Sequence, residues 1–298
     1  MKIISWNTYL APTMPNRFVR KKYVVNKIEE WINQNTDIIA LQEVNDINIG
    51  ILGYIYITFE LFKYCNIFFQ RFFDLIMVIE GKILPFFYYD NSKEIFDLAK
   101  SYNYSFVKSR ETNLGLNGGL VIISKYKYKN NMTYYLPTDL CHIPNLLLVE
   151  YNNFILINNH LLPNLPNYTL LYRLVNLFNY LCCINIRKKQ IENINTLNTF
   201  TSVKHKNKYV VGDFNIKKKG DNELYNYLIK QTKLIDSVDY ICTEHHLDYN
   251  DGELGHEEDQ IDYILSNKRP IKKCIRIEDT KHISDHYPIL SIYEKIDF

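Results

Sequence analysis

One stretch of the chain reads Tyr209-Val210-Val211-Gly212-Asp213-Phe214-Asn215. Its β-branched and aromatic start predicts a buried strand, and its polar end marks where that strand would meet a site. In extended geometry Asp213 and Asn215, two positions apart, would point to the same side. Gly212 has no Cβ and would allow another backbone to approach closely. We therefore expect a rigid sheet that presents a carboxylate and an amide together at one edge.

Two further runs, nearer the C-terminus, also join polar groups to an apolar strand. They read Gln260-Ile261-Asp262-Tyr263 and Ser284-Asp285-His286-Tyr287-Pro288. A carboxylate that accepts the imidazole Nδ1–H fixes the tautomer of a histidine and leaves Nε2 free to take a proton from water. We expect Asp262 and His286 to form such a pair. Asp285 would either bind a metal ion or hold the loop.

Polar side chains follow three strand-like runs in the first half of the chain. Asn7 follows the run 2–6, Glu43 follows the buried run 37–41, and His160 follows the run 154–159. An amide and a carboxylate at neighbouring strand ends can share one hard cation such as Mg²⁺. We expect Asn7 and Glu43 to bind Mg²⁺, with Mn²⁺ as the alternative ion. His160 could donate to a phosphate oxygen or to a leaving oxygen as charge develops.

Apolar periodicity along the whole chain predicts many strands and few helices. Strand-like runs recur at 119–124, 146–150, 154–159, 208–212, 261–266 and 288–293. Helical spacing is found at 20–34, over much of 168–200 and near 222–231. Strands so outnumber simple strand–helix–strand crossovers that a sandwich of mixed sheets is favoured over one doubly wound parallel sheet. No repeat or linker divides residues 1–298, so we expect a single domain.

Composition limits the class of protein. The net charge of +2 gives no basic field over the whole surface, although basic clusters such as 187–189 and 217–219 could line a site. The six cysteines lack the spacing of metal or disulfide motifs, and no signal segment precedes the first strand. We therefore expect an intracellular protein with free thiols. No run of about 18 uncharged apolar residues predicts a transmembrane helix.

Two segments differ from the rest of the chain. Residues 54–89 are rich in Phe and Tyr interrupted by charges, and residues 161–183 carry a series of Leu and aromatic side chains. We favour packing within the fold, as an insertion at 54–89 and as a core-facing helix at 161–183. The alternative is an apolar rim that enters a membrane interface or holds lipid chains.

Seven short motifs, taken in order, resemble those of the endonuclease/exonuclease/phosphatase superfamily. They are Trp6-Asn7, Gln42-Glu43, Asn117-Gly118-Gly119-Leu120, Asn159-His160-Leu161, Gly212-Asp213-Phe214-Asn215, Ile261-Asp262-Tyr263 and Ser284-Asp285-His286. They extend from the first strand to the last and so cover essentially the whole chain. The resemblance implies a four-layer α/β sandwich, in which two packed mixed sheets are flanked by helices and the site lies at one sheet edge.

Within that superfamily the chain is most similar to the neutral sphingomyelinase branch. The supporting features are Asn7-Thr8-Tyr9 and the run 118–126, then Arg187-Lys188-Lys189-Gln190-Ile191 and Ser284-Asp285-His286-Tyr287-Pro288. Two features depart from that branch: residues 143–146 stand where it usually has a Lys-Gly step, and the insertion at 54–89 has no counterpart that we can place. These departures concern choline-lipid specificity and not the hydrolytic core.

By position, the resemblance implies roles for the strand-end residues. Asn7 and Glu43 would bind Mg²⁺, Asp213 and Asn215 would position the water and the phosphate, and His160 would stabilise the phosphoryl oxygens. The implied function is a Mg²⁺-dependent phosphodiesterase that hydrolyses its substrate by in-line attack of water, without a covalent intermediate.

In that reaction His286 would be the base, oriented by Asp262, and Asn117 falls at a phosphate-contacting position. The favoured substrate is a phospholipid headgroup, cleaved by a monomer that contacts membranes only peripherally. A DNA or RNA nuclease on the same core is the first alternative, and a phosphoinositide or nucleotide-end phosphatase is the second. An inactive binding module that keeps the fold is the third.

Overall fold

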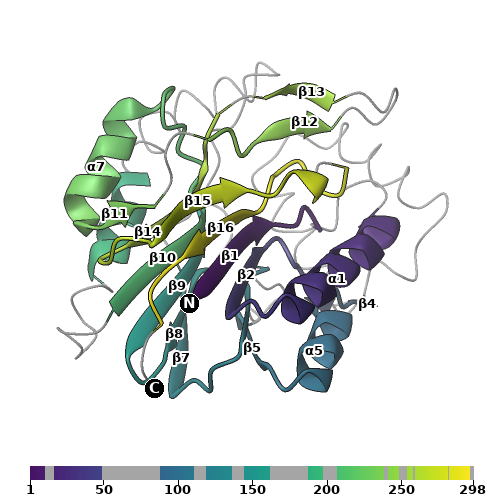
Figure 1. Cartoon of the computed structure of the whole chain (residues 1–298). Helices are drawn as coiled ribbons and strands as arrows, with labels where there is room; N and C mark the ends of the chain where they lie inside the picture. Colours follow the sequence, from purple (N-terminus) through teal and green to yellow (C-terminus); the bar gives the residue numbers. More distant parts are fainter. Residues whose placement is uncertain are drawn as a thin grey trace, which may run out of the picture.

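The structure is a computed structural model, and it describes residues 1–10, 17–48, 88–110, 119–135, 144–161, 187–196, 207–237, 241–247, 254–257, 259–280 and 282–295. Two six-stranded sheets form its centre (Figure 1). Most of the segments 54–89 and 161–183 lies outside the described residues, as does Asn117. The interpretations of these segments therefore remain predictions.

The first sheet has the strand order β15-β16-β1-β2-β6-β5. Its strands are β15 (Lys272–Arg276), β16 (Ile289–Ile292), β1 (Lys2–Asn7), β2 (Ile38–Gln42), β6 (Val121–Ser124) and β5 (Ser105–Lys108). The central pair β1 and β2 is parallel, and every other neighbouring pair is antiparallel. Because β1 and β2 run in the same direction, the residues that end them lie at the same edge of the sheet.

The second sheet repeats this plan with the strand order β11-β14-β10-β9-β8-β7. Its strands are β11 (Ile235–Asp236), β14 (Asp262–Ser266), β10 (Asn207–Asp213), β9 (Phe154–His160), β8 (Pro144–Glu150) and β7 (Asn130–Tyr135). Again the central pair, β9 and β10, is parallel and its neighbours are antiparallel. The edge at which β9 and β10 end is where the sequence places His160 and Asp213.

Outside the two large sheets, the described residues also form two two-stranded sheets and one short 3-10 helix. β12 (His245–Leu247) pairs with β13 (Leu254–Glu257), and β3 (Ile47–Asn48) pairs with β4 (Tyr88–Tyr89). A 3-10 turn, η1 (Glu278–Thr280), precedes the loop that carries His286. Because Asn48 pairs with Tyr88, the two positions that flank the undescribed residues 49–87 lie side by side.

Helices cover the outer face of each sheet (Figure 1). α1 (Arg17–Asn33) and α5 (Ser92–Ser101) lie side by side against the first sheet. α7 (Asn222–Thr232) lies beside the second sheet, and residues 187–196 are also helical. The helix predicted over 168–200 is therefore described only for this last part.

Alternation of side chains along the strands separates three apolar layers. Between the two sheets, Ile3 and Ile38 of the first belong to one cluster with Leu156 and Tyr209 of the second. The opposite face of the first sheet buries Ile4 and Ile39 against Trp31 and Ile95 of the helices. The opposite face of the second buries Val210 and Leu265 with Ile191 and Leu228. The predicted four-layer α/β sandwich of mixed sheets is confirmed.

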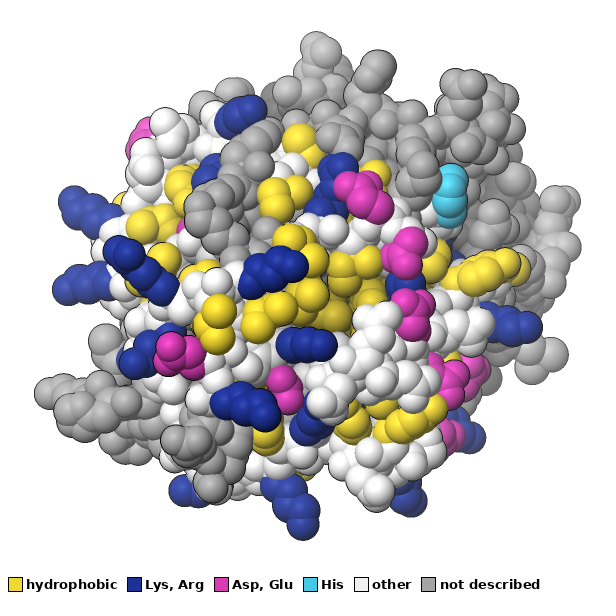
Figure 2. Space-filling view, viewed as in Figure 1, with side chains coloured by type: hydrophobic (Ala, Val, Ile, Leu, Met, Phe, Trp, Pro, Cys, Tyr) yellow, Lys and Arg dark blue, Asp and Glu magenta, His cyan; other side chains and the backbone are white. Residues whose placement is uncertain are grey.

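The surface on the side seen in Figure 1 carries no block of one charge. Apolar side chains gather at its centre, and Lys, Arg, Asp and Glu are dispersed around them (Figure 2). Two of the exposed apolar residues are Ile271, just before β15, at 66% exposure, and Ile275, on β15, at 40% exposure. Within the described part of the chain, no helix has both the length and the apolar character that crossing a membrane requires.

Candidate active site at the sheet edges

Asn7 and Glu43 meet where the parallel strands β1 and β2 end. Asn7 pairs in register with Gln42, so the next residue, Glu43, emerges beside it. The Asn7 amide Nδ2 donates to Glu43 Oε1 at 3.1 Å. Glu43 adopts a left-handed backbone conformation, with φ of 59°, that turns its side chain back toward the strand end. The expected proximity of these two side chains is thus present.

Asp213 and His160 meet in the same way at the end of the second sheet. The two residues are paired in the parallel register of β9 and β10. His160 Nε2 lies 3.5 Å from Asp213 Oδ2 and 3.7 Å from Glu43 Oε1. Asn7 Nδ2 also donates to Asp213 Oδ2 at 3.1 Å. Polar groups from both sheets therefore converge on one place.

Gly212 allows this convergence because β9 passes close to it. A Cβ at position 212 would lie 2.0 Å from the carbonyl oxygen of Asn159, and Gly212 has a φ of 132°. Only glycine meets both conditions without strain. The close backbone approach expected at Gly212 is present, and the neighbour is the strand that carries His160.

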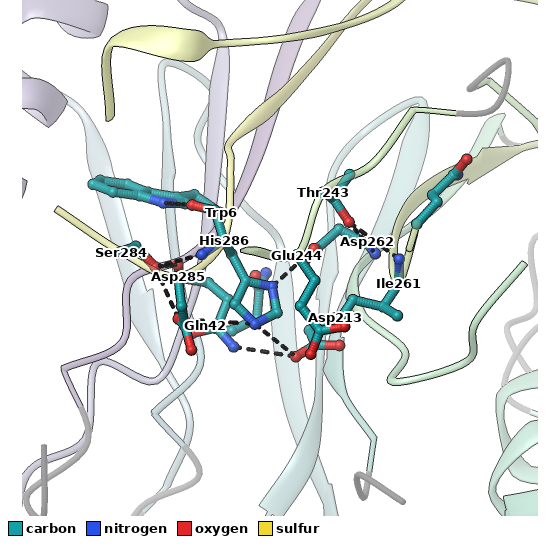
Figure 3. A network of polar contacts seen from close by, with 12 residues as sticks. Trp6, Gln42, Asp213, Thr243, Glu244, Ile261, Asp262, Ser284, Asp285 and His286 are labelled. Atoms are coloured by element: carbon teal, nitrogen blue, oxygen red, sulfur yellow. Dashed lines mark hydrogen bonds and ion pairs between the residues drawn. The ribbon is translucent and has the colours of Figure 1, made fainter. Parts of the chain in front are cut away.

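His286 and Asp262 form the expected pair. His286 Nδ1 lies 2.9 Å from Asp262 Oδ2, and both side chains are buried. On its other side, His286 Nε2 faces Asp213 Oδ2 at 3.9 Å and Asp285 Oδ1 at 4.0 Å (Figure 3). Asp262 is brought to this position because it pairs with Asp213 in the antiparallel register of β14 and β10.

The loop that carries His286 is tied to β1 by two hydrogen bonds and is braced by a third within the loop. Ser284 Oγ donates to the carbonyl oxygen of Asn7 at 2.7 Å and accepts from the His286 backbone N–H at 3.1 Å. The indole Nε1 of Trp6 donates to the His286 carbonyl oxygen at 3.0 Å (Figure 3). The imidazole is thus fixed at both its backbone and its ring.

Thr243 supports the same pair from a segment in which no motif was recognised. Its Oγ1 accepts from the backbone N–H groups of Ile261 and Asp262, each at 3.1 Å (Figure 3). Its carbonyl oxygen accepts from Tyr287 N at 2.8 Å, and the adjacent Glu244 forms a β-bridge with His286. A threonine in an unremarkable loop gives no sequence signal for this position, because its contacts are all long-range.

The position of Asn215 differs from the expected one, in which extended geometry would point it to the same side as Asp213. The strand ends at Asp213, and Asn215 has a φ of 51°, so extended geometry does not place the two side chains on one side. Instead, the Asn215 backbone N–H donates to Asp213 Oδ1 at 2.7 Å. Its amide Nδ2 donates to the Leu161 carbonyl at 2.9 Å, and buried Arg187 donates to the Asn215 carbonyl. A turn therefore keeps Asn215 beside the site.

Burial and crowding set the charge states of these groups. Burial raises the pKa of Asp213 above its ordinary value despite the nearby histidines. Burial, with Glu43 and Asp213 nearby, raises the pKa of Asp285 to about 6. Burial alone would lower the pKa of His286, but Asp262 and Asp285 raise it well above its ordinary value. The protein's own groups thus leave an excess of negative charge here.

The donor set fits a hard divalent cation. Oε2 of Glu43 is buried and has no hydrogen-bond partner, which leaves an anionic oxygen available as a ligand. Asp213, Asp262 and His286 also offer ligand atoms that all lie within 4.8 Å of one another. The side chains of Glu43, His160 and Asp285 are 16–25% exposed, so solvent reaches the site.

Comparison with known proteins identifies the fold. No protein-family model matches the sequence, and no curated protein does. Solved structures do match over the full length. An endonuclease/exonuclease/phosphatase family protein from Leptotrichia buccalis is 20% identical, with a TM-score of 0.57 and 100% of both chains covered. This chain therefore has the fold of endonuclease/exonuclease/phosphatase proteins, as the sequence motifs implied.

Two other similar structures contain ligands. A Neisseria 3′ phosphatase, NExo, bound to a product DNA hairpin is 14% identical, with a TM-score of 0.57 over 99% of this chain and 100% of that one. A variant of beta toxin from Staphylococcus aureus with bound magnesium ions is 16% identical, with a TM-score of 0.55 over 98% and 99%. At these identities the likeness defines the fold alone.

Proposed function

We propose that this protein is a metal-dependent phosphoric ester hydrolase, and more narrowly a Mg²⁺-dependent phosphodiesterase. One observation carries the proposal: His286 is bonded to Asp262 through Nδ1 while Nε2 faces Asp213. An imidazole held in this way is oriented to accept a proton from water. It lies at the edge where Glu43 and His160 supply a carboxylate and a second imidazole.

In the proposed reaction His286 Nε2 accepts a proton from water as the water oxygen forms a bond to phosphorus. The bond to the leaving oxygen breaks on the opposite side, which is in-line displacement. Asp213 and Asn215 position the attacking water and the phosphate. His160, partly exposed beside them, donates to a phosphoryl oxygen or to the leaving oxygen. Asn117 is assigned a phosphate contact only from the sequence resemblance.

Asn7, Glu43 and Asp285 are the residues that would hold the cation. The buried oxygen of Glu43 without a hydrogen-bond partner supports this assignment, as does the raised pKa of Asp285, which is caused first by burial and then by the nearby Glu43 and Asp213 carboxylates. When bound, Mg²⁺ or Mn²⁺ would neutralise the charge that develops on the phosphoryl group. Neutralisation of Asp285 would also remove one of the charges that raise the pKa of His286.

For the substrate we propose a phospholipid headgroup, as in a sphingomyelinase-like enzyme. The sequence resemblance to the neutral sphingomyelinase branch supports this choice. The net charge of +2 also favours it over a nucleic-acid backbone, which proteins bind through clustered Lys and Arg side chains.

A nuclease or a nucleotide-end phosphatase is the second candidate. It is favoured by the similar structure of the NExo 3′ phosphatase, which is bound to a DNA hairpin. A basic side chain also lies near the site: Lys217, two residues after Asn215, is 40% exposed, with its Nζ 3.8 Å from Glu244 Oε2.

The experiment that tests the proposal compares these substrates directly. Purified protein is incubated with Mg²⁺ or EDTA and with sphingomyelin vesicles, single- and double-stranded DNA, DNA that carries a 3′-phosphate, or RNA. His286→Ala is the blank, and His282→Ala, an exposed histidine four residues away, is the matched control. Headgroup release that needs both Mg²⁺ and His286 supports the lipid assignment. Cleaved nucleic acid with intact lipid supports a nuclease, and release of phosphate from DNA that carries a 3′-phosphate supports the nucleotide-end phosphatase. No turnover of any of these diesters or of the 3′-phosphate contradicts both candidates.

A further inference from the structure

The apolar layer between the two sheets changes character directly beneath the site. Along β2 the side chains that face this layer are Ile38, Ala40 and then Gln42. Along β9 they are Phe154, Leu156 and then Asn158. Gln42 and Asn158 are fully buried, with no exposed surface. The last layer of the core before the site is therefore made of amides.

These two amides join the sheets through directional hydrogen bonds. Gln42 Nε2 donates to Asn158 Oδ1 at 2.7 Å, from the first sheet to the second. Asn158 Nδ2 donates in return to the carbonyl oxygens of Leu41 at 2.8 Å and Val121 at 3.1 Å. Leu41 and Val121 are the last pair in the β2–β6 register, so Asn158 binds that ladder where it ends.

The same amides are adjacent in sequence to the residues of the site. Gln42 immediately precedes Glu43, and Asn158 lies two positions before His160, on the same face of β9. The carbonyl oxygen of Gln42 also accepts from the Thr8 backbone N–H at 3.0 Å and from Thr8 Oγ1 at 2.9 Å. Through its side chain and its backbone carbonyl, Gln42 therefore connects the end of β2 with the ends of β9 and β1.

Stability alone does not account for this layer. Oε1 of Gln42 is buried without a hydrogen-bond partner, which costs free energy that an apolar side chain would not incur. Apolar side chains of similar volume commonly replace buried polar pairs without loss of stability. What an apolar layer lacks is direction, because dispersion contacts do not fix how far one sheet slides over the other.

We propose that Gln42 and Asn158 are positioning residues for the hydrolytic site. Their hydrogen bond fixes the separation between the first sheet, which supplies Asn7 and Glu43, and the second, which supplies His160. This inference rests on the proposed function, since it assigns the amides a role in that reaction. The site needs such a device because displacement of a reacting group by about 1 Å can lower a rate by about 100-fold.

The test removes the polar layer while filling its volume, in the double variant Gln42→Leu/Asn158→Leu. Leu156→Val is the matched control, because Leu156 is equally buried on the same face of β9, one layer further from the site. Three quantities are measured for each protein. They are kcat and KM for bis(p-nitrophenyl) phosphate with Mg²⁺, Mn²⁺ affinity by electron paramagnetic resonance, and the free energy of unfolding in urea.

For the double variant we expect kcat to fall by about 10- to 100-fold with KM within about twofold of wild type. Mn²⁺ affinity falls severalfold. The free energy of unfolding also falls, because the buried carbonyl oxygens of Leu41 and Val121 lose the Asn158 donor. Leu156→Val also lowers stability but keeps wild-type kcat and Mn²⁺ affinity, so a loss of stability by itself does not account for the effect on the rate. A double variant with wild-type kcat and wild-type Mn²⁺ affinity overturns the inference.

Gln42→Met covers the case in which the double variant does not fold. This single change removes the bond between the Gln42 and Asn158 side chains and leaves the other two bonds between the sheets, from Asn158 to the Leu41 and Val121 carbonyl oxygens, in place. A fall of about tenfold in kcat is expected, and wild-type kcat in the folded variant overturns the inference. Wild-type protein that neither hydrolyses the diester nor binds Mn²⁺ contradicts the proposed function itself, and the positioning role with it.

Discussion

His286 is surrounded by carboxylates on two sides, and they act differently. Asp262 Oδ2 is hydrogen-bonded to His286 Nδ1 at 2.9 Å. The carboxylate oxygens of Asp213 and Asp285 lie about 4 Å from His286 Nε2, on the other side of the ring. The first contact fixes the ring and its tautomer, and the others alter the charge on the face where a proton would be transferred. Replacing one carboxylate at a time separates these effects.

Asp262→Asn should lower kcat by about 10³- to 10⁴-fold, because an amide can hold the imidazole in the wrong tautomer. It should also move the acidic limb of the pH profile. A base works only when it is unprotonated, so the rate rises with pH through the pKa of His286. Asp262 raises that pKa, and its neutralisation should therefore shift the limb to lower pH. The measurement is kcat/KM against pH for both proteins.

Asp236→Asn is the control for that experiment. Asp236 is a carboxylate on β11, in the same sheet, and it binds Lys218 and Tyr225 away from the site. Its loss should leave the pH profile unchanged. An unshifted acidic limb in Asp262→Asn would show that the titrating base is not His286.

Glu43→Gln should weaken Mn²⁺ binding by at least about tenfold, because it removes one anionic oxygen from the ligand set. The change is nearly isosteric, and the remaining Oε1 can still accept from Asn7, so the melting temperature without metal should be unchanged. Titration calorimetry with Mn²⁺ measures the affinity. Glu94→Gln, on an exposed carboxylate of α5, is the control and should bind as wild type does.

At the scale of single residues, the sequence predicted which side chains meet but not how each one is held. Asp262 and His286 were paired correctly because each follows or precedes a recognisable strand. Asn215 was placed by extended geometry, whereas a left-handed turn positions it. Thr243 was missed because its role depends on long-range contacts that no local pattern encodes.

Strand pairing under the site depends on Gly212. We expect Gly212→Ala to reduce the free energy of unfolding by about 3 kcal/mol or more, because the added Cβ would lie 2.0 Å from the Asn159 carbonyl in a backbone conformation that alanine avoids. Gly220→Ala is the control. Its Cβ would lie 3.2 Å from Lys217 Cβ, a tight contact that needs only a small shift, so the loss should be within about 1 kcal/mol. Urea unfolding measures both; equal losses would contradict the steric argument.

Most elements with strong apolar periodicity were predicted within a few residues of their observed bounds. The run at 208–212 became β10 (Asn207–Asp213), and the helical spacing at 20–34 became α1 (Arg17–Asn33). α5 (Ser92–Ser101) and β7 (Asn130–Tyr135) were not predicted. β7 is a largely polar edge strand and carries no strong pattern, whereas α5 is amphipathic but only 10 residues long.

Metal binding should stabilise the whole molecule. A cation that binds only the folded chain adds about 2.7 kcal/mol at a free concentration 100 times its Kd. The crowded carboxylates of Asp213 and Asp285, with raised pKa values, are the groups that it would relieve. We expect saturating Mn²⁺ to raise the melting temperature by about 5 °C, as measured by calorimetry. At the same Mn²⁺ concentration, Glu43→Gln should lose about half of this shift or more, because tenfold weaker binding removes about 1.3 kcal/mol of the stabilisation. An equal shift in both proteins would place the metal elsewhere.

The architecture of the molecule was easier to predict than the contacts between its sheets. Alternating apolar residues fix which face of each strand is buried, and this leads directly to stacked layers. The offset of one sheet relative to the other is set by Gln42 and Asn158. In the sequence these are two ordinary polar residues at the ends of apolar strands, and their pairing appears only in three dimensions.

The pairing of β1 with β16 has a consequence for biosynthesis. A ribosome makes β1 and β2 early, and both strands can associate as they emerge, but β16 is among the last elements to be translated. Until then the nascent chain carries Asn7 and Glu43 without His286. Such distant pairing slows folding, because a long loop must close before any contact forms. Catalytic competence would therefore arise only after translation has passed His286 and β16 has paired with β1.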